Sequence, residues 1–517
     1  MSLPDVLPNV HPCQKCYAKR ECMVYAGAAA RRSDDPRDAS VVQTHKELLE
    51  SFTGNLSDDD IAYFQKWDRL IDLEADAGYS NKAEAWLVPS AEREETTSKC
   101  ISSLCFDPTT SSSDALFDDT AAATISFKRS STSPLETPLQ NLGFEGGCFV
   151  MVSTDSTSTS AGNETNINHS RPYMGIVRGI MERASDSTVT IRAKHDDLTR
   201  IRKFVSRLEA NSAGQQAILF RLDRDELSTG VGTLRQNLIN LFAGDVEDQT
   251  RNPNRLAWLR DVIVRTRTPS FDGTVSLFSP AAGHVPSIPG CDLEELAFEF
   301  SELNEDQRAA AQKVITAKDY SLIQGLPGTG KTSTIAFVAR LLAAHGKRVL
   351  ISSYTNAAVD NVLLKLIENG LATTDSSWPT PALIRVGRES ACHPGVNSVH
   401  ALNAAKDFER KKAENLNQLS DTLKTEVQEL PSPDSLHRVV SQARIVGATA
   451  STVPRSALLA REHFDVVIVD EAGQITQPAI IGALMTADTF VLLGDHMQLP
   501  PLVTSELADK GGKSRRR

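Results

Sequence analysis

One stretch of the sequence constrains the fold of this chain more than any other feature: Gly325-Leu-Pro-Gly-Thr-Gly-Lys331-Thr332. It follows a short apolar run, Tyr320 to Gln324, and precedes an apolar, helix-like segment, Ser333 to Ala344. Strand, glycine-rich loop and helix, in this order, form the arrangement that a phosphate-binding loop requires. The alternative is a glycine-rich turn without a ligand, and the flanking strand and helix make it the weaker interpretation.

The residue types in this loop predict what each part does. Its glycines let the backbone turn so that successive N–H groups and the N-terminus of the following helix face one anion. Lys331 can then reach the β- and γ-phosphates of a nucleotide such as ATP, and the Thr332 hydroxyl can ligate Mg²⁺. The predicted nucleotide contacts in the loop are Gly325, Gly328, Thr329, Gly330, Lys331 and Thr332.

Length and composition set the frame around the loop. A chain of 517 residues is too long for one ordinary core, which predicts about three or four domains. Because no run approaches the length of a membrane span and the N-terminus has no signal-peptide pattern, we expect a soluble, intracellular protein without a membrane partner. The formal net charge is −11, so contact with nucleic acid would have to come from a local basic groove.

Three of the eight cysteines lie close together near the N-terminus, at Cys13, Cys16 and Cys22. This spacing favours metal ligation in a reducing compartment, because two intervening residues place the first two sulfur atoms on one side of a tight turn. A zinc site or a four-iron cluster needs a fourth ligand. The candidates that stay open are His11, Cys100, Cys105, Cys148 and a cysteine in a segment that this chain lacks. The alternative is three buried thiols without a metal.

The first half of the chain combines helical and strand-like patterns. Apolar residues from Val41 to Leu73 recur at helical spacing and predict two helices joined by residues 53–55, with Ser57 capping the second. Residues 107–140 and 153–170 are rich in Ser and Thr, and we expect both to be mobile loops. Alternating runs predict a small β-barrel, which either binds single strands or serves as a spacer: Cys148 to Ser153, Met174 to Met181, Thr188 to Ala193 and Ala217 to Leu222. Helical spacing returns at Leu234 to Phe242 and Arg255 to Arg267.

Polar motifs surround the loop in the second half. Asn304 is placed to cap a helix, and the Gln307 amide can pair both edges of an adenine. Tyr354 to Asn361 follows the predicted strand Lys347 to Ser353, and its hydroxyls, amides and N–H groups suit a phosphodiester backbone. Further strands are predicted at Ala382 to Val386, Arg444 to Ala448, Asp465 to Val469 and Thr489 to Leu493, and a solvated helix or helix pair at Ala404 to Glu429.

Two of these strands are followed by residues that can bind a metal ion or take part in catalysis. Asp470 and Glu471 follow an apolar strand; Asp470 can hold Mg²⁺ through water, and Glu471 can orient and deprotonate an attacking water. A carboxylate pair at a strand end is usually only solvated, but the upstream phosphate loop favours catalysis here. Gln498 lies just beyond the next strand, in Gly494-Asp-His-Met-Gln-Leu-Pro-Pro501, and could sense the γ-phosphate. The predicted catalytic residues are Lys331, Asp470, Glu471 and Gln498.

These motifs carry a family resemblance. The phosphate loop, Tyr354 to Asn361, Asp470 to Gln474 and Gly494 to Pro501 resemble, in order and spacing, motifs I, Ia, II and III of superfamily 1 helicases of the 5′-to-3′ branch. Within that branch they are most similar to the eukaryotic DNA-replication helicase/nuclease family that trims Okazaki-fragment flaps. Leu326 supports this choice, because the nonsense-mediated-decay RNA helicases usually have proline there.

The resemblance implies a function and several partners. It implies an ATP-dependent 5′-to-3′ DNA helicase/nuclease of replication and repair, acting on single-stranded DNA or a 5′ flap in the nucleus, with the mitochondrion as a second location and a single-strand DNA-binding protein as a partner. The family carries three cysteines at the spacing of Cys13, Cys16 and Cys22, which help to ligate a [4Fe–4S] cluster. An RNA helicase of the same branch and a non-catalytic nucleotide-binding interaction protein remain the alternatives.

The fold that follows is α/β: a RecA-like P-loop domain with a parallel sheet, preceded by a helical stalk, a small β-barrel and a cysteine-rich segment. The expected domains are an iron–sulfur segment at the end of a nuclease domain, a helical segment, the barrel, the stalk and the first motor domain, at residues 1–40, 41–98, 99–225, 226–300 and 301–517. The family's nuclease residues and second motor domain have no counterpart in this sequence, so we expect a fragment with little activity by itself.

Overall fold

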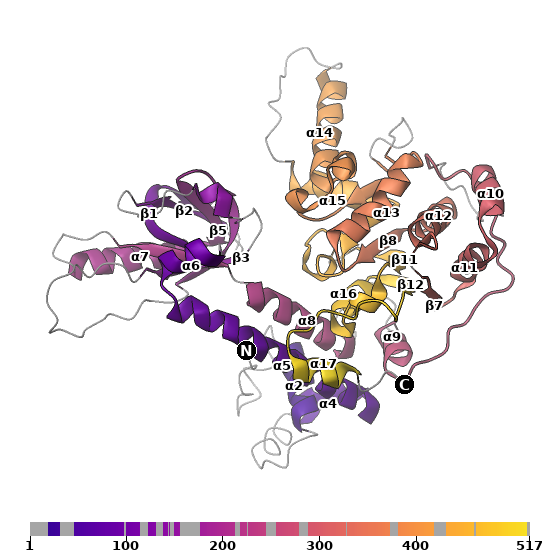
Figure 1. The fold of residues 1–517 in the computed structure, drawn as a ribbon, viewed down its shortest axis with the longest axis horizontal. Coiled ribbons are helices and arrows are strands. Elements are labelled where there is room, and N and C mark those ends of the chain that lie inside the picture. Colours follow the sequence, from indigo (N-terminus) through magenta and orange to yellow (C-terminus); the bar gives the residue numbers. More distant parts are fainter. Residues whose placement is uncertain are drawn as a thin grey trace. The chain divides into compact units, whose positions relative to one another are not determined.

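The structure is a computed structural model, and it divides into two compact units, Met1–Asp72 with Gly232–Arg517 and Leu73–Val231 (Figure 1). Each unit is described by itself. The described residues are 19–30, 46–97, 100–113, 122–130, 138–142, 144, 149–155, 176–211, 218–224, 226–243, 255–278, 288–326, 328–372, 381–417, 431–459 and 462–513.

The unit Leu73–Val231 contains a closed barrel, which confirms the predicted barrel. Among the described residues, its strands are β1 (Cys100–Ser113), β2 (Ala122–Arg129), β3 (Phe149–Thr154), β4 (Val177–Ala184), β5 (Thr188–Lys194) and β6 (Phe220–Arg224). They pair antiparallel in the order β1-β2-β5-β4-β3-β6. Alternate side chains such as Ile125, Phe127, Val189 and Ile191 fill the interior, because successive residues of a strand face opposite sides.

The expectation of a mobile loop at residues 107–140 is wrong in part. The end of β1 and the whole of β2 lie in this stretch, and they pair from Asp107↔Ser126 to Ser113↔Ala123. The prediction relied on the overall composition of the stretch and overlooked the alternation of Ile125 and Phe127 with polar neighbours. Both side chains are completely buried in the barrel. Of the second predicted loop, residues 156–170 lie outside the described residues.

Two helices accompany the barrel, α6 (Ser90–Thr97) and α7 (His195–Asn211). Buried polar contacts tie α6 to the strands: Arg93 Nη1 donates to Asp223 Oδ1 at 2.8 Å, and Glu94 Oε2 accepts from the Ser102 N–H and hydroxyl at 2.7 Å each. Because these groups are nearly inaccessible to water, each partner offsets the desolvation of the other. Helix α6 is therefore held against the barrel strands by buried polar contacts.

The N-terminal helices of the other unit follow the predicted pattern with one correction. They are α2 (Lys19–Ala30), α4 (Lys46–Thr53) and α5 (Asp58–Leu87), so the second predicted helix runs well past Leu73. Ser57 caps α5 as predicted: its N–H and hydroxyl donate to Asp60 Oδ2 at 2.9 Å, and its oxygen accepts from the Asp60 N–H. Phe64 packs edge-on against Phe242, with ring centroids 5.7 Å apart.

A parallel sheet forms the centre of this unit. Within the described residues it contains β7 (Tyr320–Gln324), β8 (Val349–Ser353), β9 (Leu383–Arg385), β10 (Ile445–Thr449), β11 (Phe464–Val469) and β12 (Ala487–Gly494), in the order β7-β12-β11-β8-β10-β9. Each agrees with a predicted strand to within two or three residues. Since all pairs are parallel, the carboxyl ends of the strands meet at one edge, where α/β sheets place their binding loops.

From residue 226 onward, the described helices are α8 (Glu226–Phe242), α9 (Arg255–Ile263), α10 (Leu293–Glu302), α11 (Glu305–Thr316), α12 (Lys331–Ala344), α13 (Asn356–Glu368), α14 (Ala401–Asn417), α15 (Pro433–Gln442), α16 (Gln477–Leu484) and α17 (Glu506–Lys513) (Figure 1). The helix expected at Ala404 to Glu429 is α14, which ends at Asn417, and residues 418–430 lie outside the described range. Helix α12 is deeply buried, and its side chains Phe337, Ala339 and Leu341 are inaccessible to solvent. None of the helices in the described part of the chain is long and apolar enough to cross a membrane.

Candidate nucleotide-binding site

The glycine loop lies at the carboxyl end of β7, as the sequence predicts. Gly328 and Gly330 have φ angles of 77° and 79°, the left-handed region that glycine enters at little cost. Gly330 is the N-cap of α12 and, having no side chain, leaves the amides of the first helical turn uncapped. These N–H groups open onto the loop and create a partial positive charge there, which suits an anion.

Lys331 folds back over the loop. Its Nζ donates to the carbonyl oxygens of Gly325 at 2.8 Å and Leu326 at 3.0 Å. A Cβ on Gly325 would lie 2.7 Å from the Lys331 side chain, so only glycine leaves room for this conformation. The Lys331 ammonium group therefore lies against the backbone carbonyls of the loop itself.

Gln307 contacts the loop from α11. Asn304 caps this helix as predicted, with Asn304 Oδ1 accepting from the Gln307 N–H at 2.9 Å and Gln307 Oε1 accepting from the Asn304 N–H at 3.1 Å. Gln307 Nε2 also donates to the Thr329 carbonyl at 3.2 Å. The side chain thus joins the helix start to the phosphate loop, and its contact with an adenine stays a prediction.

The two carboxylates stand at the end of β11. Asp470 is only 6% exposed, and its Oδ1 accepts from the Glu471 N–H at 2.9 Å. Burial raises the pKa of Asp470, against the lowering influence of that hydrogen bond and of Lys331. Burial and the neighbouring Asp470 carboxylate raise the pKa of Glu471 as well. Glu471 adopts a left-handed backbone conformation, with φ at 52°, which turns the chain sharply after the strand.

The segment after β12 supplies the last part of the site. Gln498 Nε2 donates to Asp495 Oδ2 at 3.1 Å, and the Met497 N–H donates to Asp495 Oδ1 at 3.0 Å. These hydrogen bonds lower the pKa of Asp495, so its carboxylate stays ionised and anchors Gln498. Gly473 and Gly494 let the two segments approach: a Cβ on Gly494 would lie 3.0 Å from the Gly473 nitrogen.

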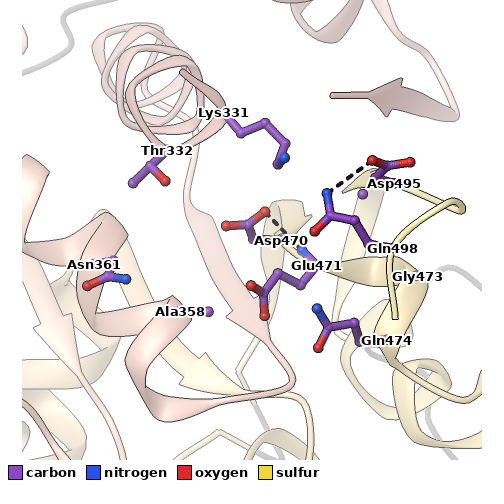
Figure 2. A pocket seen from close by; sticks show the side chains of 11 residues that line it. Lys331, Thr332, Ala358, Asn361, Asp470, Glu471, Gly473, Gln474, Asp495 and Gln498 are labelled. Carbon is purple, nitrogen blue, oxygen red and sulfur yellow. Dashed lines mark hydrogen bonds between the residues drawn. The ribbon is translucent and has the colours of Figure 1, made fainter. Parts of the chain in front are cut away.

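One pocket collects these groups, as Figure 2 shows. The start of α12 provides one side, and the segments after β11 and β12 provide the other. The pocket brings together five predicted site residues, Lys331, Thr332, Asp470, Glu471 and Gln498, and adds Ala358, Asn361, Gly473, Gln474, Gly494 and Asp495. The other predicted nucleotide contacts, Gln307, Gly325, Gly328, Thr329 and Gly330, are not among its lining residues. A hydroxyl, a buried carboxylate and an ammonium group in one pocket form a set that can bind a metal-bound polyphosphate.

The sequence analysis gave no role of its own to Asp495, and it assigned Asn361, as part of Tyr354 to Asn361, to a phosphodiester backbone and not to the nucleotide pocket. Asp495 directly follows β12, which lies beside β7 in the sheet. Its position at the carboxyl end of a strand could have identified it as a site residue from the sequence. Within the polar stretch from Tyr354 to Asn361, Asp360 is buried. It is 2% exposed and forms an ion pair with Arg385, whose Nε lies 2.7 Å from Asp360 Oδ1.

Comparison with known proteins agrees with this geometry. Residues 302–430 and 400–506 match the family described as an AAA domain. The DNA replication ATP-dependent helicase/nuclease JHS1 of Arabidopsis thaliana is 28% identical over 99% of this chain, and the DNA2 helicase/nucleases of Xenopus laevis and Homo sapiens are 29% and 28% identical over the same share. The chain is a relative of the eukaryotic DNA replication helicase/nucleases. This confirms the predicted resemblance. The chain spans 33% of the Arabidopsis relative and 40% of the other two.

The cysteines that resemble the cluster ligands of this helicase/nuclease family lie largely outside the described residues. Of Cys13, Cys16 and Cys22, only Cys22 is described; it lies in α2 and is half-buried. No group of His, Cys, Asp and Glu in the described ranges is arranged to hold a metal. Among the candidate fourth ligands, Cys100 lies in β1 and is wholly buried, and burial raises the pKa of its thiol, which disfavours a thiolate. The cluster therefore stays a prediction.

Proposed function

We propose that this chain carries the first, RecA-like motor domain of an ATP-dependent 5′-to-3′ DNA helicase/nuclease that acts in DNA replication and repair. The observation that supports it most is the pocket in which Lys331, Thr332, Asp470, Glu471 and Gln498 meet from segments far apart in the sequence. The relatives are named DNA replication ATP-dependent helicase/nucleases, which supports both the proposed reaction and its place in DNA replication.

The pocket residues can share the work of phosphoryl transfer. Lys331 and the amides of the loop would hold the β- and γ-phosphates, as in other P-loop proteins. The Thr332 hydroxyl and the Asp470 carboxylate are oxygen donors lining one pocket, which fits Mg²⁺. The ion would neutralise charge on the phosphates.

Water activation falls to the residues opposite the loop. Glu471, whose raised pKa makes it a better proton acceptor, would orient the attacking water and accept its proton. Gln498 would contact the γ-phosphate while Asp495 holds its amide in place. Gln307 would hold the loop and reach the adenine.

The remaining assignments rest on the same resemblance. We propose that the segments at residues 1–40, 41–98, 99–225, 226–300 and 301–517 are the domains of this part of the protein. Single-stranded DNA or a 5′ flap is the proposed substrate, a single-strand DNA-binding protein a proposed partner, and the nucleus the proposed location.

A [4Fe–4S] cluster held in part by Cys13, Cys16 and Cys22 is also proposed, because their spacing resembles that of the three cluster cysteines of the helicase/nuclease family. Anaerobically purified protein should then absorb broadly near about 400 nm and contain iron and acid-labile sulfide. A Cys13→Ser/Cys16→Ser variant should lose both signals. Zinc in place of iron would contradict the cluster.

Nucleotide binding tests the central proposal directly. The purified chain should bind a fluorescent ATP analogue in the presence of Mg²⁺, and Lys331→Ala should weaken binding by roughly 10- to 150-fold, the usual worth of a hydrogen bond to a charged group. Lys365→Ala is the matched control, because Lys365 is exposed on α13 and pairs with Glu368. Equal affinity of the Lys331→Ala variant and the unaltered chain would refute the site.

Phosphate release with and without nucleic acid separates the candidate functions. Stimulation by single-stranded DNA supports the DNA helicase, and stronger stimulation by RNA supports an RNA helicase of the same branch. Tight nucleotide binding without hydrolysis, even after the relatives' remaining domains are supplied in trans, would indicate a non-catalytic nucleotide-binding protein.

A further inference from the structure

Two adjacent serines at the end of β8, Ser352 and Ser353, bury their hydroxyl groups. Both residues are inaccessible to solvent, and neither hydroxyl has a hydrogen-bond partner in the part of the chain that the structure describes. Burial of such a group is unfavourable, because the hydroxyl gives up its hydrogen bonds to water and gains none in return. Each of the two hydroxyls therefore needs a physical explanation.

The two serine side chains face opposite sides of the sheet, because successive residues of a strand alternate. Ile351, two residues before Ser353, belongs to the apolar core that contains the buried residues of α12 and α13. A Cβ on Gly447, which pairs with Ile351, would lie 2.7 Å from the Leu363 side chain of α13, so this helix covers that side of the sheet. Ser353 therefore faces α12 and α13, and Ser352 faces the opposite side.

Asp470 lies beside Ser353 on the side that α12 and α13 cover. The register pairs Ser352 with Val469 of β11, and the Asp470 N–H donates to the Ser352 carbonyl at 2.9 Å, so the pairing extends one residue further. Ile468, two residues before Asp470, lies in the same apolar core, which places the Asp470 side chain on the same side as Ser353. Since adjacent strands lie about 4.8 Å apart, the hydroxyl is within reach of the carboxylate.

The other polar neighbour of Ser353 already has a partner. Thr449 of β10 pairs with Ser353 in the register, and its hydroxyl bonds the Thr452 hydroxyl at 2.8 Å. Asp470, by contrast, accepts from the Glu471 N–H through Oδ1, and no residue in the described ranges donates to its Oδ2. Of the two polar side chains that flank Ser353 in the sheet, Asp470 is the one with an oxygen left to accept.

Ser352 has no acceptor side chain beside it in the sheet. Its partners in the register are Val469 of β11 and Ala448 of β10, and both side chains are apolar. The two serines are therefore alike in residue type and burial, and they differ in that only Ser353 lies next to a proposed metal ligand.

A donor beside Asp470 acquires a role when a metal ion binds. Carboxylates that ligate a metal are usually held by hydrogen bonds of their own, which fix their orientation. The Glu471 N–H holds one oxygen of Asp470, and a second donor would fix the rotation of the carboxylate. A serine hydroxyl turns about a single bond, so it can make this contact without a movement of the backbone. Hydrogen bonds to an ionised carboxylate are also stronger than those between neutral groups.

We propose that Ser353 is a positioning residue for the metal site, whose hydroxyl donates to the Asp470 carboxylate and holds it in the orientation that binds a Mg²⁺–nucleotide complex. This inference rests on the proposed function, because that function makes Asp470 a metal ligand. Ser353 is not among the residues that line the pocket, so it acts through Asp470.

The Mg²⁺ dependence of nucleotide binding tests this role. The purified chain is titrated with Mg²⁺ at a fixed concentration of the fluorescent ATP analogue, and anisotropy follows binding. Ser353→Ala should raise the Mg²⁺ concentration for half-maximal binding roughly 10- to 100-fold, the usual effect of losing a residue that holds a metal ligand. Binding of Mn²⁺ in the presence of ATP, measured by electron paramagnetic resonance, should weaken by a similar factor. Nucleotide affinity without a metal should not change.

Two control variants separate the hydrogen bond from packing. Ser352→Ala removes the equally buried hydroxyl on the opposite side of the sheet and should leave the Mg²⁺ dependence unchanged. Ser353→Cys fills the space of the serine but donates only weakly, so it should behave like Ser353→Ala. In the absence of metal and nucleotide, Ser353→Ala should melt at the same temperature as the unaltered chain or a higher one, because the substitution removes a buried hydroxyl without a partner.

The outcomes separate this inference from the proposed function. If Ser353→Ala leaves the Mg²⁺ dependence unchanged, the inference is wrong, and weaker binding by Lys331→Ala in the same assay would leave the nucleotide site standing. Equal losses in Ser352→Ala and Ser353→Ala, or a loss of nucleotide affinity that is the same with and without Mg²⁺, would also overturn the inference. If the unaltered chain bound no nucleotide, the proposed function and the inference would both be wrong.

Discussion

Replacing Gly330 with alanine tests the link between Gln307 and the phosphate loop. Gly330 has a φ of 79°, and a Cβ at this position would lie 2.6 Å from Gln307 Nε2. The new methyl group would force the Gln307 amide away, which breaks its hydrogen bond to the Thr329 carbonyl. Gly330→Ala therefore adds backbone strain and removes a support of the loop in one step.

The expected size follows from these two effects. A non-glycine residue in the left-handed region costs about 1–2 kcal/mol, and the lost hydrogen bond costs about 0.5–1.5 kcal/mol. Together they predict that the dissociation constant for a fluorescent ATP analogue rises roughly 10- to 400-fold, because the loop must regain its binding conformation. In a Gln307→Ala background the obstacle is absent, so only the strain should remain.

The double-mutant cycle provides the decisive comparison. The coupling free energy between the two substitutions should be about 0.5–1.5 kcal/mol, with Gly330→Ala less damaging when Gln307 is already alanine. Titration by fluorescence with Mg²⁺ present measures all four affinities. A Gly330→Ala chain that binds as tightly as the unaltered one, or a penalty that is equal in both backgrounds, would refute the contact as the support of the loop.

Two further predictions concern buried charges. Burial raises the pKa of Asp470, so its ionisation disfavours the folded state as the pH rises above about 4, the pKa of an aspartate in the unfolded chain. Asp470→Asn should therefore raise the melting temperature at pH 7, and it should also abolish Mg²⁺-dependent nucleotide binding. The gain in melting temperature should vanish below about pH 3; a gain that persists there would contradict this cause. Arg385→Met leaves Asp360 buried without its partner and should destabilise the unit by about 3–5 kcal/mol in urea unfolding. Asp360→Asn in that background should recover much of the loss, and failure to do so would argue against the ion pair as the cause.

The sequence allowed us to predict which segments meet in the pocket, because these segments follow strands of one sheet. Gly325 to Thr332, Asp470 and Glu471, and Gln498 each come just after an apolar run, and parallel strands bring such segments to one edge. Local capping was equally readable, since Asn304 and Gln307 have the spacing of a capping box. Periodicity and residue spacing are local properties of the sequence, and the strands, the phosphate loop and the helix cap depend mainly on them.

Tertiary contacts account for what the sequence did not reveal. The Ser- and Thr-rich composition of residues 107–129 suggested a loop, but the barrel neighbours provide backbone partners and a core for Ile125 and Phe127. Asp360 lies in a polar run to which the sequence analysis gave no buried partner, yet it forms a buried ion pair with Arg385 of β9. A partner 25 positions away leaves no signal in local periodicity.

Helix α13 links the candidate nucleotide pocket to strand β9. Ala358 and Asn361 on its first turns line the nucleotide pocket, while Asn356 and Asp360 on the same turns bind Arg385. Because a short, buried helix moves as one body, a change around the phosphates that shifts Asn361 must also shift Asn356. The movement would reach β9, because Arg385 of that strand donates to both Asn356 and Asp360. Under the proposed function, a change at the bound nucleotide would therefore be transmitted to β9 through the first two turns of α13, and the Arg385–Asp360 pair sets how rigidly the helix and the strand are joined.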